Sequence, residues 1–351
     1  MAYAYQIEDK SITVPVLKKY LWAPSMALVS QRRSANTLTL AGNACSALAF
    51  VLLAVYRPLG APDELFLLPA VLLFAFLTLD NLDGMQARRT GRCSPYGEFL
   101  DHWGDTFNMG SISLGFGLSM ELPPWMILTT LGLCQLTNFS QFWEQRLTGW
   151  LRFGPVGGTE GVLLVSLLYV AVAALGWETV ARTPLWGPVT FAHVFWGTAC
   201  AGFVHAGSSC LWRVRREPSA FTTLTLVVLL AAAWHAWGGL GVFPAAFTMA
   251  LAGSLFTGRQ ITHRILERPF PAFEWPLLWL VAAGFAVSLS QGGGAENAVV
   301  AVASWLPVGY LSLRLAGDFL GMTYHLAEHV QPDELVSIFL LPRRLFGPRR
   351  G

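Results

Sequence analysis

Residues 80–105 read DNLDGMQARRTGRCSPYGEFLDHWGD and connect two long apolar stretches of the chain. Asp80 and Asp83 are three residues apart, so a helix would place them on one face. Asp101 and Asp105 are four residues apart and would share a face of the helix that follows. Ionisable residues at the edge of a membrane helix cost free energy unless they have partners. Four carboxylates in one short segment therefore predict bound cations.

A break between the two helices is expected at Cys93-Ser94-Pro95, because proline disfavours the helical conformation in the residue before it. An antiparallel hairpin would then bring the two carboxylate pairs face to face. Carboxylate oxygens suit Mg²⁺, Mn²⁺ or Ca²⁺, and a two-metal site commonly clamps a phosphoryl centre during displacement. The predicted chemistry is therefore phosphoryl transfer.

The residues between the aspartates fit a nucleotide substrate. Small residues at Gly84, Ala87 and Gly97 leave room for a nucleotide to approach the backbone. The guanidinium of Arg88 can neutralise pyrophosphate oxygens through a bidentate contact. The alternative is that the four acids only form ion pairs with the neighbouring arginines at the membrane surface.

The composition outside this segment is that of a membrane protein. Of the 351 residues, 54% are hydrophobic and 13% are charged, which is too apolar for a soluble domain. A hydrocarbon core needs about 20 apolar residues per helix. We therefore predict an all-α, polytopic membrane protein with ten candidate spans, at residues 37–56, 63–80, 98–119, 123–143, 160–176, 187–211, 220–238, 242–257, 274–290 and 297–315.

An amphipathic segment precedes the first span. Residues 11–30 mix apolar side chains with Lys18 and Lys19, which is typical of a helix in the membrane interface. The expected organisation is an interfacial segment over 1–36, catalytic helices over 37–215, and further helices with a basic tail over 216–351.

The positions of the basic residues predict the orientation in the membrane. Cytoplasmic connections are enriched in Lys and Arg. If the N-terminus is cytoplasmic, the cytoplasmic segments hold Arg88, Arg89, Arg92, Arg146, Arg152, Arg213, Arg215, Arg216, Arg259, Arg264, Arg268, Arg343, Arg344, Arg349 and Arg350. The opposite connections offer only Arg57 and Arg182. The four aspartates are thus expected on the cytoplasmic side, and the basic tail favours lipid headgroups over nucleic acid.

The segment 80–105 resembles the signature of the CDP-alcohol phosphotransferase family, D-x2-D-G-x2-A-R-x8-G-x3-D-x3-D. All eight positions are filled, by Asp80, Asp83, Gly84, Ala87, Arg88, Gly97, Asp101 and Asp105. The resemblance implies that the four aspartates bind two divalent ions, Mg²⁺ or Mn²⁺. It also implies a nucleotide-binding set of Asn36, Asp80, Gly84, Ala87, Arg88 and Gly97.

Further segments are similar to the choline/ethanolamine phosphotransferase branch of that family. Asp9-Lys10-Ser11 is similar to its DKS, and residues 151–154 (LRFG) with Thr159-Glu160 are similar to its LRFG and TE. Residues 36–39 (NTLT) are similar to its PN-x-IT, although Ala35 stands in place of the proline. His102 follows the third aspartate as in that branch. The resemblance implies CDP-choline or CDP-ethanolamine as donor, diacylglycerol as acceptor, and a homodimer.

A general base is needed to take the proton of the lipid hydroxyl. His102 is preferred, because its ordinary pKa lies near working pH. The branch resemblance implies that Glu160 orients it. Asp105 is the rival base, although a carboxylate held by metal is a weak one.

Other functions remain as alternatives. A phosphatidyltransferase would share the signature but use CDP-diacylglycerol and a small alcohol. An ion-coupled transporter would also bind ions through acids in its membrane helices, but no internal symmetry indicates one. The run His325 to His329 reads HLAEH and matches the zinc-peptidase pattern H-x-x-E-H. The Arg-, Ala- and Gly-rich composition favours a bacterial inner membrane, with the endoplasmic reticulum as the alternative.

Overall fold

A computed structural model describes residues 6–214, 218–292, 294 and 297–326. Within these residues, ten helices are at least 15 residues long. They are α3 (Ala35–Tyr56), α4 (Leu67–Thr90), α5 (Pro95–Ser119), α6 (Pro124–Thr148), α7 (Gly158–Leu175), α9 (Phe191–Arg213), α10 (Thr222–Ala236), α11 (Val242–Ile265), α12 (Trp275–Ser290) and α13 (Ala298–His325).

Each long helix overlaps one of the ten expected spans, and the all-α polytopic fold is confirmed. By length and composition, four helical stretches in the described residues could cross a membrane, at Ala35–Tyr56, Asp63–Thr90, Gly158–Leu175 and Ala298–His325. Helices α10 and α12 are apolar but shorter. The number of crossings therefore stays a prediction.

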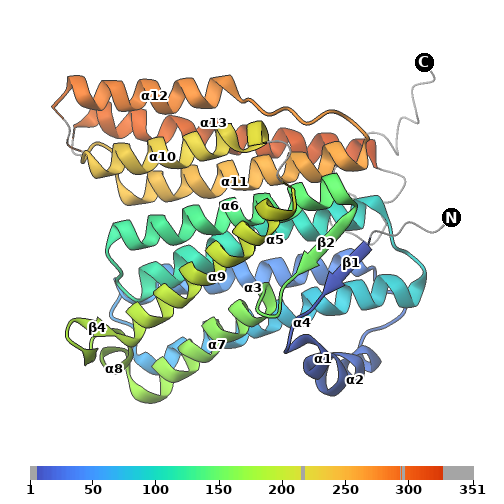
Figure 1. Cartoon of the computed structure of the whole chain (residues 1–351). Helices are drawn as coiled ribbons and strands as arrows, with labels where there is room; N and C mark the ends of the chain where they lie inside the picture. Colours follow the sequence, from blue (N-terminus) through green and yellow to red (C-terminus); the bar gives the residue numbers. More distant parts are fainter. Residues whose placement is uncertain (1–5, 215–217, 293, 295–296, 327–351) are drawn as a thin grey trace.

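The long helices lie side by side, with α10, α12 and α13 towards one edge and α4 and α7 towards the other (Figure 1). Helix α5 contacts α3, α6 and α11. It has buried residues along its length, from Tyr96 to Ser119. The helix that carries Asp101 and Asp105 is therefore held from several sides.

The hairpin between α4 and α5 forms as expected. Helix α4 ends at Thr90 and is capped by Gly91, whose φ of 66° lies in the left-handed region that glycine adopts without steric cost. Helix α5 begins at Pro95, and the Ser94 side chain accepts a hydrogen bond from the Gly97 backbone N–H at 3.0 Å. The residues of the turn itself therefore end α4 and begin α5.

The segment before α3 is helical in short pieces. It comprises α1 (Val14–Leu17), a π-helical turn (Lys18–Trp22), α2 (Ala23–Ser25) and a 3₁₀ turn (Met26–Leu28). Trp22 and Met26 are buried, whereas Lys18, Lys19 and Tyr20 are exposed, so the segment has one packed face. Figure 1 shows α1 and α2 at the same end of the molecule as β1.

Four short strands, which the all-helical expectation did not include, complete the described structure. β1 (Gln6–Asp9) pairs in parallel with β2 (Trp150–Phe153), with Gln6 opposite Trp150. At the opposite end (Figure 1), β3 (Pro184–Trp186) pairs with β4 (Val189–Thr190), and α8 (Trp177–Ala181) lies beside them. The β1–β2 pair brings the DKS and LRFG segments together.

Candidate active site

Three of the four aspartates converge. Asp80 on α4 and Asp101 and Asp105 on α5 each offer an oxygen, and these oxygens lie within 4.8 Å of one another. All three side chains are half-buried. Among the described residues, this is the only such group of three or more potential metal ligands. Oxygen-only donors fit a hard divalent cation such as Mg²⁺ or Mn²⁺.

Asp83 lies deeper and outside that group. It is 4% exposed, and its Oδ2 accepts a hydrogen bond from Thr39 Oγ1 of α3 at 2.5 Å. Thr39 is the last residue of the NTLT segment. That sequence motif includes Thr39 but does not indicate that its side chain contacts Asp83. The expected role of Asp83 as a ligand stays a prediction.

Ion pairing does not account for the aspartates. In the part of the chain that the structure describes, no ion pair within 4.0 Å joins any of the four to Arg88, Arg89 or Arg92. Arg89 instead donates to the backbone carbonyls of Met26 at 2.7 Å and Val29 at 2.6 Å. It fastens the N-terminal helical segment to α4.

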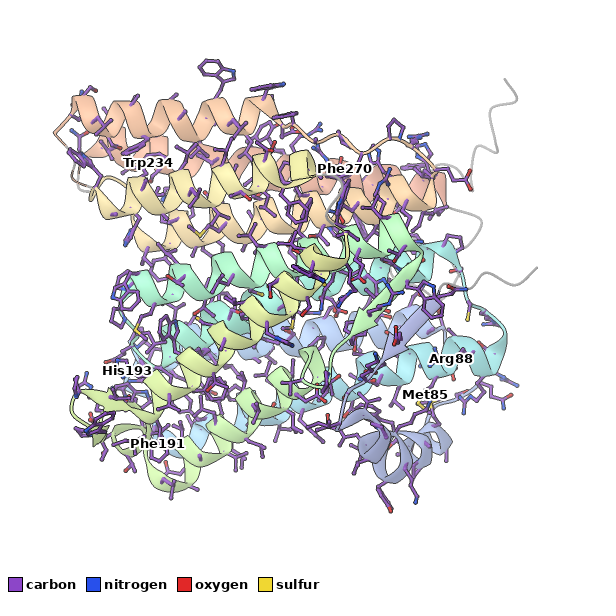
Figure 2. The ribbon with its side chains drawn as sticks, in the orientation of Figure 1. Met85, Arg88, Phe191, His193, Trp234 and Phe270 are labelled. Atoms are coloured by element: carbon purple, nitrogen blue, oxygen red, sulfur yellow. The ribbon has the colours of Figure 1, made fainter. Side chains whose placement is uncertain are left out.

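The expected nucleotide-binding residues lie around the same hairpin. A Cβ on Gly84 would be 3.3 Å from Arg88 Nη1, so the exposed guanidinium lies over that glycine. A Cβ on Gly97 would be 3.2 Å from Oδ1 of the buried Asn36. Figure 2 shows Arg88 near the end of the molecule where the hairpin turns, far from His193. Ala87 is half-buried on α4.

Asn43 of α3 and Asn108 of α5, which sequence reasoning missed, form a contact between these two helices. Asn108 lies three residues after Asp105 on α5, and its Nδ2 donates a hydrogen bond to Asn43 Oδ1 of α3 at 2.7 Å. A Cβ on Gly104 would lie 2.6 Å from Asn43 Nδ2, so a larger residue there would displace the Asn43 amide. No sequence spacing links residues 65 positions apart.

His102 lies beside the carboxylate cluster. Its side chain is 8% exposed, and Nε2 lies 3.8 Å from Asp101 Oδ2. Nδ1 lies 3.6 Å from Oε1 of Glu98, one helical turn earlier. The ring also packs on Phe142, with centroids 5.3 Å apart. This position suits the predicted role as base.

Glu160 is tied to the N-terminal segment. Its Oε1 accepts hydrogen bonds from Ser11 Oγ and from Thr13 Oγ1 at 2.7 Å, and its Oε2 accepts from the Gly157 backbone N–H at 2.7 Å. The DKS and TE segments therefore meet through these contacts. The orienting role of Glu160 towards His102 stays a prediction.

The HLAEH run is only partly within the described structure. His325 ends α13, and its Nδ1 is 2.8 Å from the Gly321 carbonyl oxygen. Glu328 and His329 lie outside the described residues, as do Arg215, Arg216 and the basic tail.

Comparison with known proteins gives the family relationship. The model of a family described as CDP-alcohol phosphatidyltransferase matches residues 32–250. Cholinephosphotransferase 1 from Xenopus laevis is 31% identical over 186 residues, covering 50% of this chain and 45% of that protein. The Homo sapiens cholinephosphotransferase 1 is 30% identical over 184 residues, covering 51% and 45%.

A third relative carries a family name only. It is an uncharacterized CDP-alcohol phosphatidyltransferase class-I family protein 3 from Dictyostelium discoideum, 29% identical over 190 residues, with 48% of this chain and 44% of that protein covered. The chain spans about half the length of the curated relatives it matches. All three relatives come from eukaryotes, so the expected bacterial membrane gains no support from them.

Proposed function

The chain belongs to the CDP-alcohol phosphatidyltransferase family, and we propose that it transfers phosphocholine or phosphoethanolamine from a CDP-alcohol to diacylglycerol. The products are CMP and a phospholipid. The observation that carries this proposal is the convergence of Asp80, Asp101 and Asp105 beside His102. Similarity to cholinephosphotransferases supports the choice of donor and acceptor.

The metal requirement follows from the donor set. Asp80, Asp101 and Asp105, together with Asp83 one turn further along α4, are the residues that would hold two divalent ions. When bound, Mg²⁺ or Mn²⁺ supplies charge neutralisation at the phosphoryl oxygens. Thr39 orients the Asp83 carboxylate through its hydrogen bond.

The chain's own residues carry the rest of the step. Arg88 binds the pyrophosphate, and Gly84 and Gly97 leave space for the cytidine nucleotide. The acceptor hydroxyl oxygen attacks the β-phosphorus and gives its proton to His102 Nε2. The bond from the β-phosphorus to the bridging oxygen breaks, and CMP leaves with that oxygen. Asp105, which lies within the metal-binding cluster, is the rival base.

The location of the site suits a soluble donor and a lipid acceptor. The hairpin, Arg88 and the amphipathic segment lie at one end of the helices (Figure 2). If that end is cytoplasmic, the CDP-alcohol enters from the cytosol and diacylglycerol from the bilayer. The proposal includes a membrane location, with the endoplasmic reticulum in keeping with the relatives, and a homodimer formed through the later helices.

The test is CMP release by the purified protein in detergent. The arms contain Mg²⁺ or Mn²⁺ and either CDP-choline or CDP-ethanolamine with diacylglycerol, or CDP-diacylglycerol with small alcohols. Release that requires diacylglycerol and one CDP-amino-alcohol supports the proposal and identifies the headgroup. Release only from CDP-diacylglycerol reverses donor and acceptor, and no release from any donor overturns the enzymatic assignment.

A further inference from the structure

We propose that Glu98 and Arg264 are positioning residues for His102, so that α11 completes the catalytic centre. Arg264 lies beyond residue 250, where the family match ends. The inference rests on the proposed function, because the position of the ring matters only if His102 acts as the base.

Glu98 is the point where three helices meet. It lies one turn before His102 on α5, and its side chain is 1% exposed. Its Oε1 accepts hydrogen bonds from Gln145 Nε2 of α6 at 3.0 Å and from Arg264 Nη2 of α11. The same oxygen lies 3.6 Å from His102 Nδ1. The position of this carboxylate is thus set by α6 and α11 as well as by α5.

The carboxylate fixes how the ring faces the metal-binding cluster. A carboxylate beside one ring nitrogen of histidine favours the tautomer with its proton on that nitrogen, and leaves the other nitrogen as the acceptor. Glu98 lies 3.6 Å from Nδ1, whereas Asp101, whose charge a bound divalent ion would neutralise, lies 3.8 Å from Nε2. In the metal-loaded site, Nε2 is therefore the proton acceptor. The proton-accepting nitrogen is then directed towards the reacting groups.

Helix α11 reaches Glu98 because its glycines allow close packing. A Cβ on Gly253 would lie 2.2 Å from Gln135 Oε1 of α6, and one on Gly258 would lie 2.4 Å from Trp103 Nε1 of α5. Trp103 Nε1 also donates to the Ser254 carbonyl at 3.1 Å. These contacts seat α11 against both helices and bring the Arg264 guanidinium to the buried carboxylate.

The test compares Glu98→Gln and Arg264→Gln with the wild type, using the full chain in detergent with diacylglycerol. We expect each change to lower kcat about tenfold, the effect of losing a partner that orients an active-site group. KM for CDP-choline and the affinity for CMP with Mn²⁺ should stay unchanged. Arg264→Lys should recover part of the lost kcat, because it restores a cation next to Glu98.

A double-mutant cycle separates positioning from general stability. In a His102→Ala background, Glu98→Gln and Arg264→Gln should leave the residual rate unchanged, since residues that act as one unit are not additive. The same fold loss in that background, or wild-type kcat in the Glu98→Gln protein, overturns the inference. If Glu98→Gln protein fails to bind CMP, the two Arg264 variants decide by the same criteria.

Glu144→Gln is the matched control. Glu144 neighbours Gln145, is also 1% exposed, and accepts hydrogen bonds from Arg213 and Arg152. We expect this variant to keep wild-type kcat. Loss of kcat there equal to that of Glu98→Gln would show a general effect of buried Arg–Glu pairs. If the wild type releases no CMP from any donor, the proposed function itself is wrong.

Discussion

Asp80, Asp101 and Asp105 place like charges within 4.8 Å of one another in a half-buried site. Burial disfavours charge, and like charges disfavour each other, so cations must be bound if all three carboxylates are to stay ionised. The free energy of keeping these three carboxylates ionised therefore depends on bound metal more than on any protein partner.

Asp101→Asn removes one charged ligand while keeping the shape of the side chain. We expect Mn²⁺ binding to weaken and CMP release to fall by about 100-fold or more, since even partners behind the ligands contribute up to that much. Mn²⁺ titration by electron paramagnetic resonance, together with turnover, measures both effects. Tight Mn²⁺ binding with wild-type turnover would contradict the metal assignment.

A second substitution, His102→Ala, tests the proposed general base. Loss of general base catalysis should lower kcat by about 10²- to 10⁴-fold, because the proton of the hydroxyl loses its acceptor. Binding of CMP in the presence of Mn²⁺ should persist, since His102 is not one of the clustered ligands. Weak substrate binding with normal turnover at saturation would remove His102 from the catalytic set.

At the scale of helices and strands, α3 packs against both α4 and α5, the two helices that carry the metal-binding carboxylates. Thr39 of α3 donates a hydrogen bond to Asp83 of α4, and Asn43 of α3 accepts one from Asn108 of α5 beside Gly104, which has no side chain to displace the Asn43 amide. Helix α3 therefore shapes the site, although the four signature aspartates lie on α4 and α5.

Gly104→Ala should displace the Asn43 amide, which its Cβ would meet at 2.6 Å, and so break the hydrogen bond between Asn43 and Asn108 that joins α3 to α5. Overpacking typically costs about 1–3 kcal/mol, so the thermal unfolding temperature should fall along with Mn²⁺ affinity. Gly161→Ala on α7 is the control, because nothing lies within 4 Å of its Cβ position. Equal effects of the two substitutions would refute the packing argument.

Glu160→Gln tests the link between α7 and the N-terminal segment. The change weakens acceptance from Ser11 and Thr13, so amide exchange over residues 6–13 should accelerate. Hydrogen exchange mass spectrometry measures this, and kcat separates the two roles. Faster exchange with unchanged kcat makes Glu160 an anchor, whereas a loss of kcat without faster exchange supports the orienting role.

At the scale of the whole molecule, metal should stabilise the packing of the α4–α5 hairpin against its neighbours. Chelation with EDTA leaves the clustered carboxylates without counter-charge, so CMP release should stop and the thermal unfolding temperature should fall. Adding Mg²⁺ or Mn²⁺ in excess should restore both. An unfolding temperature that changes with neither chelator nor added metal would argue against an ion at this site.

The sequence by itself determined the membrane class, the ten long helices and the hairpin that carries the four aspartates. These features are local: apolar runs about as long as a bilayer core is thick form helices, and Gly91, Ser94 and Pro95 end one helix and begin the next. The signature, too, is a short contiguous pattern. For the same reason the convergence of Asp80 with Asp101 could be predicted from spacing alone.

Only the tertiary structure decided which side chains contact Asp83, Glu160 and Glu98. Thr39 meets Asp83 across 44 residues, Ser11 meets Glu160 across 149, and Arg264 meets Glu98 across 166. The parallel pairing of β1 with β2 joins equally distant segments. Such contacts depend on how helices pack, and packing is set by the summed shapes of many side chains, not by the spacing of residues along one segment.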